Sequence, residues 1–244
     1  MEGLVYGKNA VKEAIKGPRL VKEVWISEKL QQSEQNDLIK LARSDRISYH
    51  LVSPGNLDKL TGCQEHQGVA LKASPYRYSD YETVTQAMKR SKPRPFFLML
   101  DHLQDPQNFG AILRTADAVG VDGVIIPRRR AVGVTPVVLK ASSGAAEHIN
   151  IIQVPNLSRV IEAMQKNWVW VIGADTRSDY HYFEADFTGA VTLVVGSEGY
   201  GLSRLVRQKC DFIVDIPMSG KVNSLNVSVA SALLMYEIYR SRWF

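Results

Sequence analysis

The stretch FFLMLDHLQDPQNFGAILRTADAVG, residues 96–120, decides the fold of the larger part of this chain. Its first five residues are apolar, which is typical of a buried strand. In the polar loop that follows, Pro106 suits a turn, and Asp105 or Asn108 can cap a helix. A helix is predicted over residues 109–119, because apolar residues recur there at helical spacing, namely Ile112, Ala116 and Val119.

The same alternation of strand and helix continues to the end of the chain. Further apolar strands are predicted at residues 123–126, 149–154, 168–172, 191–195 and 212–216. Helical periodicity follows at residues 157–166, 202–209 and 227–240. Strands that alternate with helices predict an α/β fold in which a parallel sheet is covered on both faces. Ligands of such sheets bind beyond the carboxyl ends of the strands.

Residues 1–73 predict a smaller α/β unit in front of this domain. Its strands are expected at residues 21–26, 47–52 and 68–73, and its helices at residues 3–17 and 36–42. Residues 74–95 are rich in proline and basic residues and predict a linker, with a short helix around residues 81–90. The run Lys92-Pro93-Arg94-Pro95 marks the boundary, so that residues 96–244 form the second domain.

The composition excludes several classes of protein. Apolar residues make up 45% of the 244 residues, as in an ordinary globular protein. The only cysteines, Cys63 and Cys210, stand far apart, so neither a disulfide framework nor a zinc or other metal site is expected. No apolar run has the length of a membrane span, and the first residues lack the apolar core of a signal peptide. We therefore expect a cytoplasmic protein without membrane contacts.

The charge is distributed unevenly along the chain. The net charge of +5 divides into +2 for residues 1–73, +3 for residues 74–95 and zero for residues 96–244. The positive excess therefore lies outside the larger, C-terminal domain. Such an excess is compatible with a nucleic-acid partner, and equally with a modestly basic protein that binds none.

A second loop, LVVGSEGYG at residues 193–201, follows another apolar strand. Its three glycines allow the backbone to approach a ligand closely. Their order, GxxGxG, differs from the GxGxxG of dinucleotide-binding proteins, which disfavours an oxidoreductase. Glu198 is unexplained by the turn alone, because small residues would suffice there. The alternative is a solvated acid in a tight turn.

A third loop, IPMSGKVNSLNVSVA at residues 216–230, leads into the last helix with Asn226 as its natural cap. All three loops are expected at the same edge of the sheet. In the first, Arg114 lies off the buried stripe and should lean back over Gly110 toward Asn108, because helical side chains point toward the N-terminus. An arginine beside a helix N-terminus predicts an anion site, although each loop could also be an ordinary cap or turn.

Together these loops resemble the three motifs of the SpoU/TrmH family of RNA ribose 2′-O-methyltransferases. The matching patterns are DPxNxGxxxRTA at 105–116, LVxGxEGxG at 193–201 and IPMxGxxxSLNVSVA at 216–230. The N-terminal unit, with Tyr6-Gly7 and His66-Gln67-Gly68, resembles the substrate-binding extension of the branch that methylates a guanosine of large-subunit (23S) ribosomal RNA, the RlmB type.

The resemblance implies a SPOUT domain with a deep trefoil knot, preceded by a small ribosomal-protein-like RNA-binding domain. It implies S-adenosylmethionine as cofactor, held in the knot by backbone groups of Gly196, Ile216 and Leu225. It also implies a homodimer that forms through the knotted domain, with active sites that use residues of both subunits. The residues implied in catalysis are Arg114, Asn108, Glu198, Ser224 and Asn226.

The proposed role of Arg114 in activating the acceptor hydroxyl can be questioned on physical grounds. Neutralising an arginine at pH 7 costs roughly 9 kcal/mol, because the guanidinium holds its proton far above neutral pH. In one hypothesis Arg114 is the base. In the other it stays charged, clamps the adjacent phosphate and stabilises the developing alkoxide, while the proton leaves to Glu198, a phosphate oxygen or water.

Two alternative functions stay open at this point. One is a tRNA ribose methyltransferase of the same family, and the other is a non-catalytic RNA-binding factor of ribosome assembly. His66 and His102 have no acid partner that the sequence identifies, so both are interpreted as structural or RNA-contacting residues. The run Arg128-Arg129-Arg130 could bind phosphate or form a solvated surface.

Overall fold

The computed structural model describes residues 3–82, 84, 86, 94–178, 180–221 and 223–243. The chain forms two compact units. Unit 1 comprises residues 1–77 and 134–148, and unit 2 comprises residues 78–133 and 149–244. The expected helix around residues 81–90 falls mostly outside the described residues.

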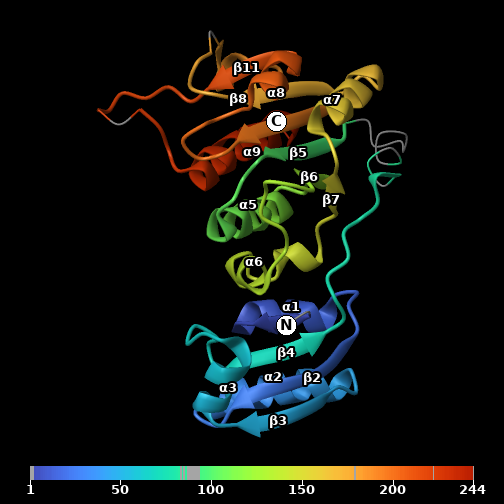
Figure 1. Cartoon of the computed structure of the whole chain (residues 1–244), viewed down its shortest axis with the longest axis vertical. Coiled ribbons are helices and arrows are strands. Elements are labelled where there is room, and N and C mark those ends of the chain that lie inside the picture. The colour runs from blue at the N-terminus through green and yellow to red at the C-terminus, as the bar shows by residue number, and fades with distance from the viewer. Residues whose placement is uncertain are drawn as a thin grey trace. The chain divides into compact units, whose positions relative to one another are not determined.

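Unit 1 is built on a four-stranded sheet in the order β1-β4-β2-β3. Figure 1 labels β4, β2 and β3 of this sheet. β2 pairs parallel to β3, and β4 pairs antiparallel to both β1 and β2. Its elements are β1 (Leu4–Tyr6), α1 (Lys8–Lys16), β2 (Val21–Ser27), α2 (Gln32–Ser44), β3 (Ser48–Val52), α3 (Pro54–Thr61), β4 (Val69–Ala73), α6 (Pro136–Ala141) and η1 (Ala145–Glu147).

The prediction of one helix over residues 3–17 is wrong in its first part. Residues 4–6 form β1, which pairs with β4, and the helix starts only at Lys8. Gly7 separates the two elements with a φ of 97°, a backbone conformation that favours glycine. The strand is stabilised by a partner some 65 residues away in sequence, which local periodicity cannot reveal.

Residues 134–148 belong to unit 1, whereas the sequence-based division places them in the second domain. An ion pair helps to fix this segment, because Arg19 Nη1 lies 2.8 Å from Glu147 Oε1 and both side chains are buried. Burial raises the pKa of Glu147, and the neighbouring Arg19 opposes that shift. Removing either partner would leave an unpaired charge in the interior, so the pair fixes the segment on its own unit.

Unit 2 contains a seven-stranded sheet, and all of its neighbouring strands are parallel, as predicted. The strand order is β7-β6-β5-β10-β8-β11-β9. The strands are β5 (Phe96–Asp101), β6 (Gly123–Pro127), β7 (Ile151–Val154), β8 (Trp170–Ala174), β9 (Tyr180–His181), β10 (Val191–Gly196) and β11 (Phe212–Asp215). The helices are α5 (Pro106–Ala118), α7 (Leu157–Lys166), α8 (Arg204–Lys209) and α9 (Val227–Trp243), with the short 3-10 helix η2 (Tyr182–Glu184).

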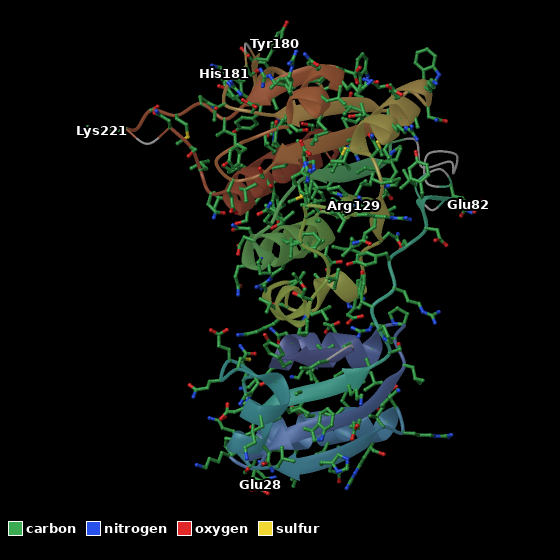
Figure 2. All side chains as sticks on the ribbon, in the orientation of Figure 1. Glu28, Glu82, Arg129, Tyr180, His181 and Lys221 are labelled. Atoms are coloured by element: carbon green, nitrogen blue, oxygen red, sulfur yellow. The ribbon has the colours of Figure 1, made fainter. Side chains whose placement is uncertain are left out.

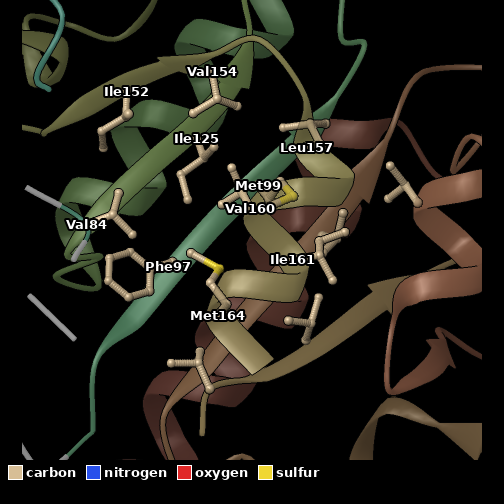
Figure 3. Close-up of a cluster of buried hydrophobic side chains, with 14 of the residues drawn as sticks. Val84, Phe97, Met99, Ile125, Ile152, Val154, Leu157, Val160, Ile161 and Met164 are labelled. Carbon is tan, nitrogen blue, oxygen red and sulfur yellow. The ribbon is translucent and has the colours of Figure 1, made fainter. Parts of the chain in front are cut away.

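The core of unit 2 explains why its strands read as continuous apolar runs. Side chains alternate between the two faces of a strand. Phe97 and Met99 of β5 therefore pack on one face, in a buried cluster that includes Ile161 and Met164 of α7 (Figure 3). Their neighbours along β5 point the opposite way and are buried as well, so both faces of the sheet are covered. α5 and α9 pack against each other outside this cluster.

No helix in the described part of the chain is long and apolar enough to cross a membrane.

Two helices that the sequence did not predict, α3 and α6, are short and begin with a proline at their first positions. Proline is favoured there because its missing N–H would be unpaired in any case.

Candidate active site

The site lies at the carboxyl edge of the unit 2 sheet, where four central strands end together. Gly196 at the end of β10 is in register with Asp101 of β5, and Val195 is in register with Ala174 of β8. Ala174 in turn pairs with Val214 of β11. The loops that follow these strands therefore start side by side, which brings the three sequence motifs to one edge.

The glycine-rich loop after β10 is a tight hairpin. Ser197 N donates to Gly201 O at 3.1 Å, and Gly201 N donates to Ser197 O at 2.9 Å. Gly199 and Gly201 have φ values of 79° and 65°. These values explain two of the three glycines, because other residues are strained in that region. The hairpin holds Glu198 at its tip.

A cavity of about 720 Å³ opens beside this hairpin. Its size is within the range of small-molecule sites. The lining includes all three residues expected to hold the cofactor, Gly196, Ile216 and Leu225, together with Glu198, Ser224 and Asn226. Glycines, apolar side chains and a comparable share of polar and charged side chains make up this wall. Such a lining fits a ligand of the size and mixed polarity of S-adenosylmethionine.

Three residues from the three motifs form a chain of hydrogen bonds at the mouth of the cavity. Asn226 Nδ2 donates to Asn108 Oδ1 at 3.1 Å, and Asn108 Nδ2 donates to Glu198 Oε1. Asn226 Oδ1 is already used, because it accepts from Ser228 N at 2.8 Å and from Ser228 Oγ at 2.6 Å. The helix cap thus fixes the orientation of the Asn226 amide. The Asn226 amide in turn fixes the orientation of the Asn108 amide, and Asn108 holds the Glu198 carboxylate.

Local helix chemistry positions both asparagines. Asp105 caps α5, since its carboxylate accepts from Asn108 N at 2.7 Å, and Pro106 occupies the first turn. Asn226 caps α9 through Ser228. These are the capping roles that the sequence predicted, with Asp105 rather than Asn108 as the cap of α5.

The structure does not bring Arg114 to this group. Its side chain is exposed on α5, and it does not line the cavity. Within the described residues no hydrogen bond or ion pair joins Arg114 to Asn108 or Glu198. Ser224 lines the cavity and is exposed.

Sequence reasoning missed a buried acid in the cavity wall. Asp175 follows β8, and its side chain is only 4% exposed. Its Oδ2 lies 3.1 Å from Arg207 Nη1, and its Oδ1 accepts from Arg177 N at 2.9 Å. The position directly after an apolar strand was the available signal, as it was for the three motifs. Tyr200 and Met218 also line the cavity without having been predicted.

Both histidines singled out from the sequence have carboxylate partners after all. His66 Nε2 lies 3.1 Å from Asp58 Oδ1, and His102 Nδ1 lies 2.5 Å from Asp101 Oδ1.

Cys210 is not a candidate nucleophile, because burial raises the pKa of its thiol to about 12 and keeps it protonated at neutral pH. Among the described side chains, no group of three or more His, Cys, Asp or Glu could hold a metal ion.

Two protein families match this chain in sequence. The profile of the SpoU rRNA methylase family matches residues 95–236. A second profile, RNA 2′-O ribose methyltransferase substrate binding, matches residues 4–79. The protein YacO of Bacillus subtilis, whose description places it in the TrmH family of tRNA/rRNA methyltransferases, is 45% identical over 238 residues, which cover 98% of this chain and 95% of YacO.

Solved structures are also similar to this chain. The SpoU methyltransferase AviRb from Streptomyces viridochromogenes is 25% identical, has a TM-score of 0.81, and matches 99% of this chain and 90% of its own. A structure that concerns 2-OH methylation of C/U34 on tRNA is 29% identical with a TM-score of 0.56. It matches 97% of its own length but only 61% of this chain.

Proposed function

Because this chain belongs to the SpoU rRNA methylase family, we propose that it transfers a methyl group from S-adenosylmethionine to a ribose 2′-hydroxyl of RNA. The proposed acceptor is a guanosine of 23S ribosomal RNA. The observation that carries the proposal is the hydrogen-bonded group Asn226–Asn108–Glu198 at the mouth of a cofactor-sized cavity. The family's deep trefoil knot remains a prediction.

The residues of the site would supply orientation and electrostatics. When bound, S-adenosylmethionine supplies a methyl group that its own sulfonium charge activates. Backbone groups at Gly196, Ile216 and Leu225 would hold the cofactor. The Asn108 and Asn226 amides would orient the acceptor ribose and Glu198, because their own orientations are fixed by the α9 cap. Ser224 would contribute a hydroxyl from the cavity wall.

Replacing Asn108 with Ala is expected to lower kcat by about 100-fold, because the amide no longer positions Glu198 relative to Asn226. The cofactor Kd should change less than about threefold, since Asn108 does not line the cavity. Single-turnover methyl transfer and calorimetry measure the two quantities. Gln107→Ala, an exposed neighbour on the same helix, is the matched control. Equal losses in both variants would contradict the role given to Asn108.

Arg114 would act in the active site of a second subunit. The proposed homodimer explains why an arginine of the first motif stays outside its own cavity. The exposed face of α9 offers an apolar contact surface, because Val229, Leu233 and Tyr236 follow each other at helical spacing with exposures of 48%, 44% and 51%. Exposed apolar stripes of this kind are typical of protein interfaces.

Changing Leu233 to Glu is expected to shift the chain from dimer to monomer, because a charge would be buried in the interface. Sedimentation velocity over a range of concentrations measures the shift. The same change at Leu205, which is 53% exposed on α8, should leave the dimer intact. A dimer that survives Leu233→Glu unchanged would rule out this face of α9.

Ribosomal RNA is favoured over tRNA as the substrate by the N-terminal unit. The residues that match the RNA substrate-binding profile, 4–79, lie almost entirely in unit 1. The tRNA-related structure matches 61% of the chain, whereas AviRb matches 99%. The extra unit therefore sets this chain apart from the smaller tRNA-related protein.

The test is transfer of radiolabelled methyl groups from S-adenosylmethionine to unmodified 23S rRNA and to tRNA transcripts, with digestion to nucleosides. We expect 2′-O-methylguanosine in the rRNA. Label confined to tRNA would keep the reaction and refute the substrate. Cofactor binding without any label would refute methylation of these free transcripts. A protein that binds RNA but not the cofactor would support the non-catalytic assembly factor instead.

A further inference from the structure

A second pocket lies at the same edge of the sheet, on the other side of the glycine-rich hairpin. It has a volume of about 520 Å³, and its lining includes His102, Gln104, Arg130, Glu198, Tyr200 and Ser203. We call it the His102 pocket. The hairpin residues 197, 198, 200 and 201 line both this pocket and the cofactor cavity. The two sites are therefore neighbours that share one wall.

The sheet order arranges these groups in a line. Arg130 follows β6, His102 follows β5, and Glu198 and Tyr200 follow β10. These strands are neighbours in the order β6-β5-β10, and β8 and β11 come next, at the cofactor cavity. Arg130 therefore lies at the end of the pocket remote from the cavity, and Glu198 lies at the shared wall.

His102 contacts a buried carboxylate in this pocket. The carboxylate of Asp101 is 1% exposed, and its Oδ1 lies 2.5 Å from His102 Nδ1. Its Oδ2 accepts from Ser203 N at 2.7 Å, so both oxygens of the buried acid are used. An imidazole whose Nδ1 is engaged in this way presents only Nε2 to a ligand. The ring is about 39% exposed.

The backbone of the pocket is strained at two positions. His102 and Arg130 have φ values of 61° and 58°, in the left-handed region that non-glycine residues rarely occupy. Of the three such residues in the described part of unit 2, only Trp168 lies elsewhere. Strain of this kind concentrates at functional sites, where it is offset by what the residue does.

We propose that the His102 pocket holds the RNA nucleotide that carries the acceptor ribose. This inference rests on the proposed methylation of RNA. Arg130 binds the phosphodiester, since a guanidinium matches phosphate oxygens with two parallel hydrogen bonds, and His102 Nε2 adds a further contact. The base stacks on the ring of Tyr200, which is 87% exposed. The ribose then lies at Glu198, between the phosphate site and the cofactor cavity.

This assignment also divides the Arg128–Arg130 run. Arg130 lines the pocket, whereas Arg128 and Arg129 do not. Arg129, which is labelled in Figure 2, is exposed and is not part of this lining. The pair Arg130 and Arg129 therefore offers a matched comparison, in which the same charge is removed inside and outside the pocket.

The test uses the full-length protein with Arg130→Asn, His102→Asn and the control Arg129→Asn. Asparagine tolerates a left-handed backbone, so the fold is kept at the two strained positions. Binding of 23S rRNA and tRNA transcripts is measured by fluorescence anisotropy over a series of KCl concentrations, and cofactor binding by calorimetry. Methyl transfer is measured on the same transcripts.

Arg130→Asn is expected to weaken RNA binding about tenfold. The slope of log K against log salt concentration should become shallower by about 0.7 to 0.9, the change expected when one phosphate contact is lost. His102→Asn should raise KM for RNA about fivefold. Both variants should bind the cofactor like the wild type. Arg129→Asn should weaken RNA binding by less than about twofold, because Arg129 lies outside the pocket and would lose no phosphate contact there.

Two results would overturn the proposal. One is equal weakening by Arg129→Asn and Arg130→Asn, which would indicate a diffuse basic surface. The other is methyl transfer by both pocket variants at wild-type KM. If the wild type binds RNA through Arg130 and His102 but transfers no methyl group, the pocket stands and the proposed reaction fails. If the wild type binds no RNA, both fail.

Discussion

Replacing Gly196 with Ala is expected to raise the cofactor Kd at least about 100-fold and to lower the free energy of unfolding by about 3 kcal/mol. A Cβ at this position would lie 2.1 Å from Gly201 C, 2.2 Å from Gly201 O and 2.4 Å from Leu202 N. These are backbone atoms, so the whole hairpin of residues 197–201 must move. Calorimetry with S-adenosylmethionine and urea unfolding measure the two effects.

Gly199→Ala is the matched control in the same hairpin. No atom lies within 4 Å of a Cβ there, and only the φ of 79° is unfavourable. We expect a loss of about 1 kcal/mol in unfolding free energy and a smaller change in cofactor Kd. If Gly196→Ala binds the cofactor as tightly as the wild type, the hairpin is not the wall of the cofactor site.

Replacing Arg114 with Ala is expected to lower kcat by about 1,000-fold with little change in the cofactor Kd. A fixed cation that stabilises the developing alkoxide and the neighbouring phosphate contributes an effect of this size. Arg159→Ala removes an exposed arginine from another helix, α7, and should be neutral. Single-turnover rates with saturating RNA separate the loss of chemistry from a loss of binding.

Arg114→Lys distinguishes the two roles of this residue. A charge clamp should retain part of the activity with the pH optimum little changed. Full activity with a lower pH optimum would instead identify a base, because lysine gives up its proton more readily than arginine. The first result agrees with the cost of roughly 9 kcal/mol for neutralising arginine at pH 7.

Mixing subunits tests whether Arg114 acts in the partner's site. Arg114→Ala and Asn108→Ala are both expected to be nearly inactive alone. If the arginine is supplied in trans, a 1:1 mixture should recover about one quarter of wild-type activity, because half of the dimers are mixed and each has one intact site. No recovery, with mixed dimers verified by mass, would place Arg114 in its own subunit's site.

The sequence predicted the features that depend on neighbouring residues, namely the strands, the helix caps and the loops at the edge of the sheet. The apolar runs became strands of the parallel sheet, Asp105 and Asn226 became helix caps, and the three motif loops met at one edge. That meeting follows from the parallel sheet itself, because all of its strands end at the same side. Gly196, Ile216 and Leu225, the residues proposed to hold the cofactor, accordingly line one cavity.

The features that local sequence did not reveal have a common cause in long-range contacts. Residues 4–6 are a strand only because β4 pairs with them, and residues 134–148 belong to unit 1, where Glu147 finds Arg19. A three-residue apolar run carries too little periodicity to distinguish strand from helix. The buried pair Asp175–Arg207 likewise depends on contacts that no local pattern records.

The sequence by itself determined the sheet, the loops at its edge and the family. Only the tertiary structure decided how the polar side chains are used. Asn108 is hydrogen-bonded to Glu198, which is 90 residues away in sequence, and to Asn226, which is 118 residues away. Arg114 is only six residues from Asn108 in sequence but is not part of this hydrogen-bonded group. His102 gained its acid partner from the adjacent residue only because Asp101 is buried at a strand end. Periodicity fixes which face a residue occupies, but a hydrogen bond requires distances and orientations that packing alone supplies.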